Sequence, residues 1–173
     1  PMGFYGPSQL VQDARRHGVE VRPVDIAVSG WDSALEEREE GGQPAVHDGR
    51  AHGGQPAVRL GMSLLRGMRL EAAERIEQTR ALRPFADVAD LARRAQLDRH
   101  DLQVLAGANA LASLAGNRRQ AVWEAVGAVP DKDLLRPTQA IEETPALRAP
   151  SEGDDIVGDY RSHGLTLGRH PLA

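Results

Sequence analysis

Residues 58–123 read VRLGMSLLRGMRLEAAERIEQTRALRPFADVADLARRAQLDRHDLQVLAGANALASLAGNRRQAVW, and this stretch carries the pattern that decides the fold. Its apolar residues recur three or four positions apart in short runs, which Gly, Pro or Asp interrupts. That period is typical of amphipathic helices, and the interrupting residues are those that begin or end them. The stretch predicts an extended lead-in at 58–60 and short helices over residues 61–65, 71–82, 87–95, 99–106 and 118–126.

The first connection between these helices has the character of a phosphate-binding hairpin. It reads Arg66-Gly67-Met68-Arg69, so that a glycine and two cations directly precede the helix at 71–82. A glycine can adopt unusual backbone dihedrals and lets backbone N–H groups approach a ligand closely. A helix N-terminus attracts anions through its unsatisfied amides and its dipole. We expect this hairpin to hold a nucleic-acid phosphate without reading a base. Solvated arginines in an ordinary turn are the alternative.

The second hairpin, Gln96-Leu97-Asp98-Arg99, lacks glycine and places an acid where a phosphate would approach. Asp98 is better suited to cap the helix that follows it. We therefore expect a tandem helix-hairpin-helix domain in which the second unit is mainly a packing partner. For the two arginines at the start of the helix at 118–126, a second backbone contact and a solvated helix start both stay open. The candidate DNA-binding residues are Arg66, Gly67, Met68, Arg69, Arg99, Arg118 and Arg119.

The composition favours a mainly α fold with a small α/β lead-in and extended, partly irregular flanks. Aromatic residues make up 3% of the 173 residues, so Ala, Leu, Val and Ile must build the core. Such small side chains suit closely approaching helices better than a β-sandwich. With 18 Gly and 11 Pro, many positions lie outside regular elements.

The net charge of -4 argues against a nucleic-acid partner, but its distribution does not. Residues 59–123 contain eleven Arg, no Lys and seven acids, a local charge of +4 that leaves -8 for the remainder. The acids cluster in 36–40 and 131–159, on either side of the basic segment. A basic segment with acidic flanks is thus expected to face the partner.

Several classes of site are excluded or disfavoured. The chain has no cysteine, so disulfides, thiolate metal sites and cysteine nucleophiles are absent. No apolar run approaches the roughly 18 residues that span a bilayer, and a cytoplasmic location is expected. His47, Asp48 and His52 lie in a glycine-rich loop without a second ligand pair, so we expect no metal site. We expect no catalytic residue either, because no serine has a Gly-x-Ser-x-Gly context.

The segments outside the basic stretch divide into four parts. We expect a helix from Ser8 to about His17, with Ser8 as N-cap and Gly18 as terminator, followed by an edge strand around Pro23. The hexapeptide GGQPAV occurs at 41–46 and again at 53–58, inside a loop. The predicted divisions are 1–35, a lead-in; 36–57, a flexible insertion loop; 58–127, the tandem hairpins; 128–155, an acidic Pro-rich linker; and 156–173, a segment that packs on another domain.

Several separate stretches of the chain, taken in order, resemble the error-prone C-family bacterial DNA polymerases, which are relatives of the DNA polymerase III alpha subunit. The opening, residues 1–5, 10–19 and 24–25, resembles the end of their fingers region. The tandem hairpin region is matched at 58–61, 66–67, 71–76, 84–85, 90–91 and 110–114, and the passage to an OB-fold domain at 159–161, 164–167 and 169–172. The resemblance covers most of the chain outside 36–57 and 130–150. It departs where Arg69 replaces a small residue and where Ile26-Ala27 replaces an asparagine-containing strand end.

The resemblance implies a parent DNA-directed DNA polymerase, a nucleotidyltransferase that extends primers across damaged templates in translesion synthesis and damage-induced mutagenesis. It implies that Mg²⁺ serves that parent in an upstream palm domain, with no cofactor in this segment. The implied partners are the primer-template duplex backbone, other lesion-bypass proteins and the sliding clamp, and no membrane. The chain itself is then expected to be a non-catalytic piece of something longer, because it opens at Pro1 in mid-pattern.

A rival hypothesis assigns the chain to protein interaction. The hairpins would then be a helical scaffold, and the acidic flanks or the leucine-rich tail would bind members of a lesion-bypass complex. Trp31 and Trp123 are expected to be core or docking residues rather than base-stacking platforms. Binding to such proteins without DNA would separate the two hypotheses.

Overall fold

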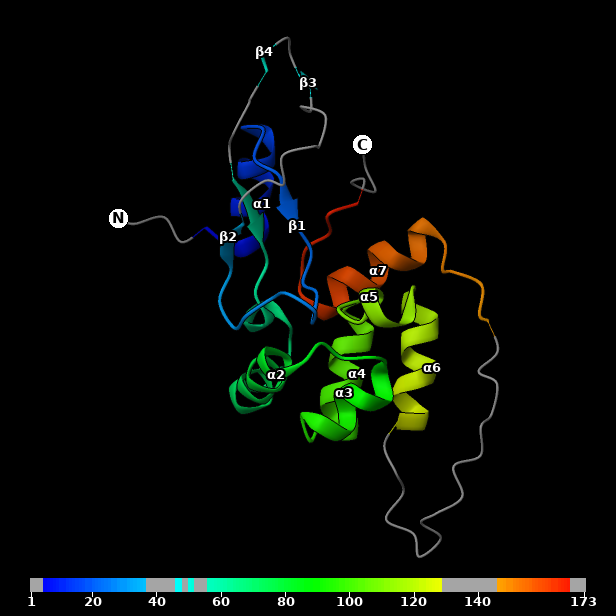
Figure 1. The fold of residues 1–173 in the computed structure, drawn as a ribbon. Coiled ribbons are helices and arrows are strands. Elements are labelled where there is room, and N and C mark those ends of the chain that lie inside the picture. The colour runs from blue at the N-terminus through cyan, green and yellow to red at the C-terminus, as the bar shows by residue number, and fades with distance from the viewer. Residues whose placement is uncertain (1–4, 37–45, 48–49, 52–55, 129–145, 169–173) are drawn as a thin grey trace, which may run out of the picture.

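The computed structural model describes residues 5–36, 46–47, 50–51, 56–128 and 146–168. In Figure 1 a small sheet and α1 lie together on one side, α2 lies below them, and the remaining helices cluster on the other side. The helices are α1 (Pro7–Arg16), η1 (Met62–Leu64, a 3-10 turn), α2 (Leu70–Leu82), α3 (Val88–Arg94), α4 (Arg99–Gly107), α5 (Ala112–Ala115), α6 (Arg118–Ala128) and α7 (Glu152–Ser162). The strands are β1 (Val21–Arg22), β2 (Ala34–Glu36), β3 (Val46–His47), β4 (Arg50–Ala51) and β5 (Ala57–Arg59). The mainly α fold expected from the sequence is confirmed.

The sheet has the order β1-β5-β2, with β1 parallel and β2 antiparallel to the central strand β5. The edge strand predicted beside Pro23 is confirmed as β1, and the extended lead-in before the first hairpin as β5. Glu36 of β2 accepts hydrogen bonds from Arg59 at 2.8 Å and from Arg22 at 2.9 Å. These bonds lower the pKa of Glu36, Arg59 contributing most and burial opposing them. One acid therefore ties the three strands together.

The N-cap of helix α1 lies two residues earlier than the sequence predicted. It is Gly6, and Pro7 occupies the first helical position. Proline is favoured there because its missing N–H would have no partner and its fixed φ suits the helix. Ser8 is thus inside the helix, and its predicted role as N-cap is wrong. The predicted terminator Gly18 is confirmed, with φ +79°.

The core lies among α2, α3, α4, α5 and α6, with α4 packed against both α6 and α7. As the composition predicted, it is built from aliphatic residues, and Phe85 is the only buried aromatic among the described residues. Alanines such as Ala106 and Ala121 are completely buried, so the helices approach closely at these positions. The largest buried side chains include Ile76, Leu91, Leu102, Leu105 and Leu111.

The loop after β1 fastens the sheet to the helices. Arg80 of α2 donates to the carbonyl oxygens of Ile26 and Ser29 at 2.5 and 2.8 Å, and burial lowers its pKa. Glu77, one turn earlier, accepts from the Trp31 amide at 2.8 Å. The Ile26 amide donates to the Ala110 carbonyl at 3.0 Å. The lead-in and the hairpin region consequently share one hydrogen-bonded junction.

Arginines converge on Asp90 at the joint between α2 and α3. Asp90 is buried and pairs with Arg93 at 2.7 Å, Arg94 at 3.1 Å and Arg83 at 3.4 Å. Burial raises its pKa, but the Ala86 amide and the Arg94 and Arg93 guanidiniums outweigh burial and lower it to about 2. Arg94 also lies 4.8 Å over the Phe85 ring and donates to the carbonyls of Thr79 and Arg83 at the end of α2. This cluster fixes the turn that follows α2.

Helix α7 lies partly in the range predicted as a linker, because it begins at Glu152. Ser151 caps it by accepting from the Asp154 amide. Arg118 of α6 holds it through Asp155 at 3.0 Å and Asp159. Among the described residues no helix is long and apolar enough to cross a membrane.

Leu102→Ala is expected to lower the free energy of unfolding by about 3 kcal/mol, because Leu102 is fully buried and its removal leaves a cavity. Leu82→Ala is the matched control, since Leu82 is 84% exposed and its change should stay within about 0.5 kcal/mol. Urea unfolding followed by circular dichroism measures both. Equal effects would place Leu102 outside the core.

Asp90→Asn is expected to flatten the acid limb of the stability profile. The folded pKa of Asp90, about 2, lies below the ordinary 3.8, so its stabilisation is complete above about pH 4 and is lost as the pH falls towards 2. Denaturant midpoints between pH 2 and 6 measure this effect. Glu74→Gln, at an exposed acid of α2 with no ion pair among the described residues, should leave the acid limb unchanged. An unchanged limb in Asp90→Asn would contradict the assignment.

Candidate nucleic-acid interface

The first hairpin connects η1 to α2 through a turn that only glycine adopts easily. Gly67 has φ +86°, and a Cβ there would meet the His100 ring at 3.4 Å. The Met68 amide closes the turn on the Leu65 carbonyl at 3.1 Å. His100 Nε2 lies 3.0 Å from the Gly67 carbonyl oxygen, so the turn rests on the first turn of α4. The predicted unusual backbone at Gly67 is confirmed, and the half-buried Met68 packs against the core.

The N-terminus of α2 has no side-chain cap. Its N-cap residue is Arg69, which accepts no hydrogen bond there. By contrast, Asp87, Asp98 and Ser151 cap α3, α4 and α7, and Asn117 accepts from the Gln120 amide at 3.0 Å at the start of α6. The first amides of an α-helix have no acceptor within the helix. In the described part of the chain, the amides of Leu70 and Glu71 at exposed positions therefore lack a side-chain acceptor.

The Arg69 side chain lies across the second hairpin instead. Its Nε and Nη2 donate to the two carboxylate oxygens of Asp101 at 3.0 and 2.6 Å, and Nη2 also donates to Asp98 at 2.5 Å. The hydrogen bonds that Arg69 donates to Asp101, and next those to Asp98, raise the pKa of Arg69. Asp101 is completely buried, and its carboxylate also lies 3.3 Å from the Asp98 amide. One guanidinium thus joins the N-termini of α2 and α4.

The second hairpin is closed by side chains of the protein. Asp98 is the N-cap of α4, as predicted, and forms a capping box with Asp101. The Asp101 amide is the main cause that lowers the Asp98 pKa, and Arg69 adds to it against burial. Gln96 takes a positive φ of +51° where a glycine is more usual, and Arg75 of α2 donates to the preceding Ala95 carbonyl at 2.8 Å. Carboxylates therefore occupy the positions where a phosphate would bind.

Three further candidate arginines, Arg99, Arg118 and Arg119, differ in their surroundings. Arg118 is mostly buried beneath α7, and Arg119 pairs with Asp154 of α7 at 3.0 Å. Arg99 is the exposed first residue of α4, beside the second hairpin. The structure thus does not bring all the predicted residues to one surface. It keeps Arg66 to Arg69 and Arg99 near the two hairpins and places Arg118 and Arg119 against α7.

Arg66 is backed by a segment that the sequence did not connect with it. Its amide donates to the Ser162 carbonyl at 2.8 Å, at the end of α7. Arg66 is exposed, and its guanidinium packs over Gly164, where φ is +73°. A Cβ added at Gly164 would lie 2.9 Å from Nη2 of Arg66. Burial lowers the pKa of the adjacent His163, Asp159 opposes this, and the charges of Arg118 and Arg66 lower it further. The available signal was Gly164, a typical helix terminator, but nothing in the sequence indicates which hairpin it meets.

The family model described as helix-hairpin-helix motif matches residues 18–121, which contain both hairpins and the three-stranded sheet. The chain belongs to this family. The first hairpin, with its turn at Gly67, and the second, with Asp98 as the cap of α4, both lie inside the matched range.

Similar proteins extend over the whole chain. It is 54% identical over 174 residues to a protein of Bordetella parapertussis named error-prone DNA polymerase, and 56% identical over 174 residues to one of the same name from Burkholderia pseudomallei. A third, from Alkalilimnicola ehrlichii, is 50% identical over 173 residues. Each comparison covers 100% of this chain but only 15 or 16% of the relative, so the chain spans about one sixth of their length. The resemblance to error-prone bacterial DNA polymerases is confirmed.

Within the described ranges, no group of three or more His, Asp or Glu residues could hold a metal ion. Asp48 and His52, two of the three residues weighed as metal ligands, lie outside the described residues. The acids that are described cap helices or pair with arginines, as Asp90 and Asp101 do. The described residues therefore offer no carboxylate cluster that would fit Mg²⁺.

Asp101→Ala is expected to lower the free energy of unfolding by about 3 kcal/mol, because it removes the acceptor that joins the two hairpins. Asp98→Ala should cost about 1 kcal/mol, the usual value for losing an exposed cap. Thermal and denaturant unfolding of the two variants compare them directly. A cost of Asp101→Ala no larger than that of Asp98→Ala would show that the buried ion pair does not join the hairpins.

Proposed function

We propose that this chain is the non-catalytic, DNA-backbone-binding segment of an error-prone DNA polymerase used in translesion synthesis and damage-induced mutagenesis. The observation that carries the proposal is the uncapped N-terminus of α2 directly after the Gly67 turn. The family of the hairpins and the similarity of the whole chain to proteins named error-prone DNA polymerase support it.

A phosphate oxygen would accept hydrogen bonds from the amides of Leu70 and Glu71. The 13-residue helix α2 places the positive end of its dipole at this point. The exposed Arg66 guanidinium adds a cation beside the turn, whereas Glu71 adds an opposing charge in the first turn. Amides and an arginine that contact phosphates carry no information about the bases, so binding is independent of sequence.

The predicted contact residues now take different parts in this proposal. Arg66, Gly67 and Met68 form the phosphate-binding turn, and Arg99 lies at the neighbouring helix start. Arg69 positions the turn through Asp101 rather than contacting DNA, since its Nε and Nη2 donate to carboxylates of the second hairpin. Arg118 and Arg119 act through the α6–α7 contact in the same way.

We further propose that a longer polymerase containing this segment is a DNA-directed nucleotidyltransferase of DNA replication and repair. Its Mg²⁺-holding carboxylates belong to parts beyond these 173 residues. The partners are the duplex of primer and template, other lesion-bypass proteins and the sliding clamp, in the cytoplasm. Binding of the duplex backbone by this segment would hold the primer end without regard to damaged bases.

The second candidate function is a protein-interaction scaffold within a lesion-bypass complex. It is favoured by an apolar groove between α6 and α7 that the hairpins do not use. The two functions use different residues, so a single chain can carry both.

Fluorescence anisotropy with short duplex and primer-template DNA tests the main proposal. Most arginines of the hairpin region already pair within the protein, so we expect a salt slope for only about two phosphates. Arg66→Ala should reduce that slope by about one and weaken two unrelated sequences equally. Glu71→Gln, which removes the opposing charge at the same turn, should strengthen binding.

Arg148→Ala is the matched control, because Arg148 is exposed and lies outside the hairpins. It should leave the slope unchanged. Failure to bind DNA at low salt, or an equal loss in Arg66→Ala and Arg148→Ala, would contradict the assignment of the contact to the first hairpin.

A further inference from the structure

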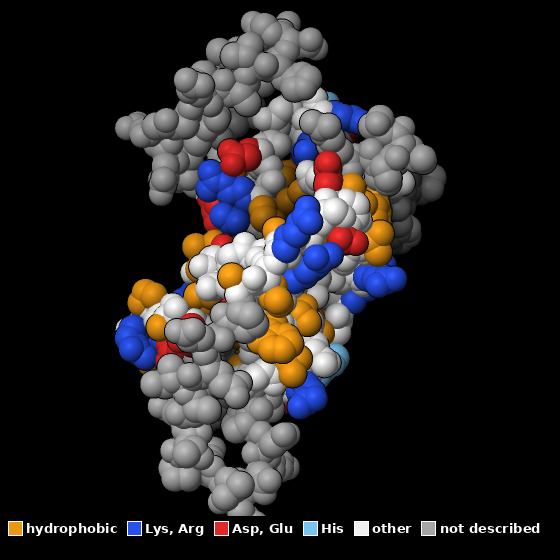
Figure 2. Space-filling view, turned by 90° about the vertical axis from the view of Figure 1, so that its right-hand side faces the viewer, with side chains coloured by type: hydrophobic (Ala, Val, Ile, Leu, Met, Phe, Trp, Pro, Cys, Tyr) orange, Lys and Arg blue, Asp and Glu red, His pale blue; other side chains and the backbone are white. Residues whose placement is uncertain are grey.

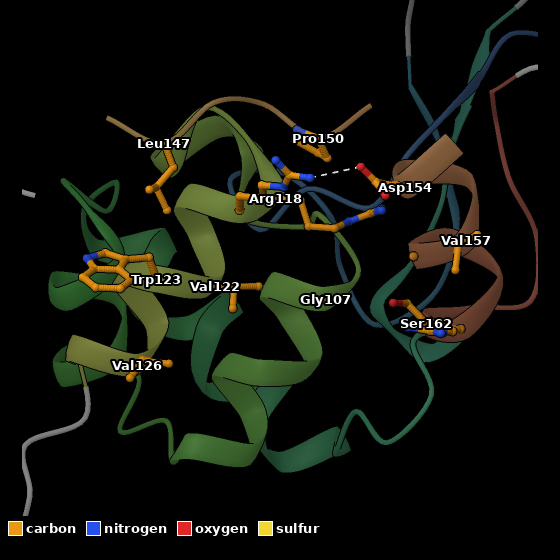
Figure 3. Close-up of a pocket in the computed structure, with 13 residues that line it drawn as sticks. Gly107, Arg118, Val122, Trp123, Val126, Leu147, Pro150, Asp154, Val157 and Ser162 are labelled. Atoms are coloured by element: carbon orange, nitrogen blue, oxygen red, sulfur yellow. Dashed lines mark hydrogen bonds and ion pairs between the residues drawn. The ribbon is translucent and has the colours of Figure 1, made fainter. Parts of the chain in front are cut away.

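An open apolar groove lies between α6 and α7. Its volume is about 910 Å³, and residues Leu147 to Pro150 close one end (Figure 3). Val122, Trp123 and Val126 line it from α6, and Val157 lines it from α7. Figure 2, which faces this side, shows apolar side chains gathered next to arginines. The groove shares no residue with the turn that holds the proposed phosphate site.

Helix α6 has two apolar faces, and only one is covered. Its alanines Ala121 and Ala125 are buried against α4 and α3. Val122, Trp123 and Val126 are 45, 54 and 52% exposed, and Val157 opposite them is 49% exposed. These are four of the ten large hydrophobic residues exposed in the described part, gathered in one place. Scattered exposed residues are ordinary, but a rimmed apolar cluster of this kind marks a contact surface.

The charges at the rim of the groove favour an acidic occupant. Its lining contains Arg118, Arg119 and Arg161 against one acid, Asp154. The first two are engaged by the aspartates of α7. Arg161 is exposed and has no hydrogen bond or ion pair with another described residue. A carboxylate on the occupant would complete the pairing that Arg161 lacks.

We propose that this groove binds an amphipathic helix of a partner protein, with aliphatic residues three and four positions apart and an acid that meets Arg161. Two helices form its walls, and Val122, Trp123 and Val126 form a stripe at helical spacing along one of them. Together with Arg119 that stripe covers about two turns, roughly 10 Å, which suits a short helix lying in a groove. Single-stranded DNA fits less well, because the lining surface is mainly apolar and offers one aromatic side chain, Trp123, for a base to stack on.

In the test, helical 16-residue peptides are selected from a display library for binding to the whole chain. The expected winners carry Leu, Ile or Phe at helical spacing together with Asp or Glu. Their binding is followed by the blue shift of Trp123 fluorescence in a Trp31→Phe background, which leaves Trp123 as the only tryptophan. Sequences without this pattern, or no enrichment, would overturn the proposal.

Val126→Asp and Val28→Asp form a matched pair, because these valines are 52 and 51% exposed and only Val126 lines the groove. Val126→Asp should weaken the selected peptides at least tenfold, and Val28→Asp less than twofold. Trp123→Ala, read by anisotropy of labelled peptide, is a second groove variant whose melting curve is compared with that of the parent chain. Arg161→Glu should reverse the preference from acidic to basic peptides. Equal binding of the selected peptides by Val126→Asp and by the parent chain would contradict the proposal.

Two other occupants are measured alongside. A blue shift or quenching of Trp123 with a 20-nucleotide oligo(dT), lost in Val126→Asp, would assign the groove to single-stranded nucleic acid and overturn the peptide proposal. A dimer in analytical ultracentrifugation that Val126→Asp dissociates would assign it to a second copy and also overturn it. Duplex binding through Arg66 is measured in a separate experiment. Failure of the DNA-binding proposal can therefore be told apart from failure of the peptide-groove proposal.

Discussion

The buried carboxylate of Asp101 holds the two hairpins of this protein together. It accepts hydrogen bonds from Nε and Nη2 of the Arg69 guanidinium and lies beside the Asp98 amide at the start of α4. A buried carboxylate requires such a partner, because the cost of removing its charge from water is otherwise uncompensated. Arg69 is also the N-cap residue of α2, so the pair fixes how the uncapped helix start lies relative to the second hairpin. The geometry of the phosphate site thus depends on a contact in which no phosphate takes part.

Most of the positive charge in residues 59–123 is paired within the protein and is not available to a nucleic acid. Of the eleven arginines in 59–123, at least nine donate to acids or backbone carbonyls of the protein: Arg59, Arg69, Arg75, Arg80, Arg83, Arg93, Arg94, Arg118 and Arg119. A core poor in aromatic residues is small, and these ion pairs and carbonyl contacts join helices that apolar packing alone would hold less firmly. The segment is basic mainly for its own folding. A nucleic-acid contact then rests on backbone amides and few cations.

Helix α7 relates the hairpin region to the groove. Its first turns pair with Arg118 and Arg119, its middle forms one wall of the groove, and its last carbonyls receive the Arg66 amide. Gly158 makes this possible, since a side chain there would collide with the Arg118 guanidinium. The proposed DNA contact and the proposed peptide groove are consequently built on one short helix, since Ser162, whose carbonyl accepts from the Arg66 amide, also lines the groove.

The sequence by itself determined the main helices of the hairpin region, the cap of α4 and the special turn. Periodicity located α2, α3, α4 and α6, and local chemistry identified Asp98 as a cap and Gly67 as the residue with an unusual backbone, because each depends only on neighbours within a turn of helix. Tertiary structure alone decided which arginines are available. Arg66 and Arg69 are three residues apart in the same turn, yet one guanidinium is exposed and the other is bound to an aspartate 32 residues later. It also decided that α7 covers Arg118 and leaves Trp123 open, since ion pairs and packing between distant segments leave no periodic trace in either one.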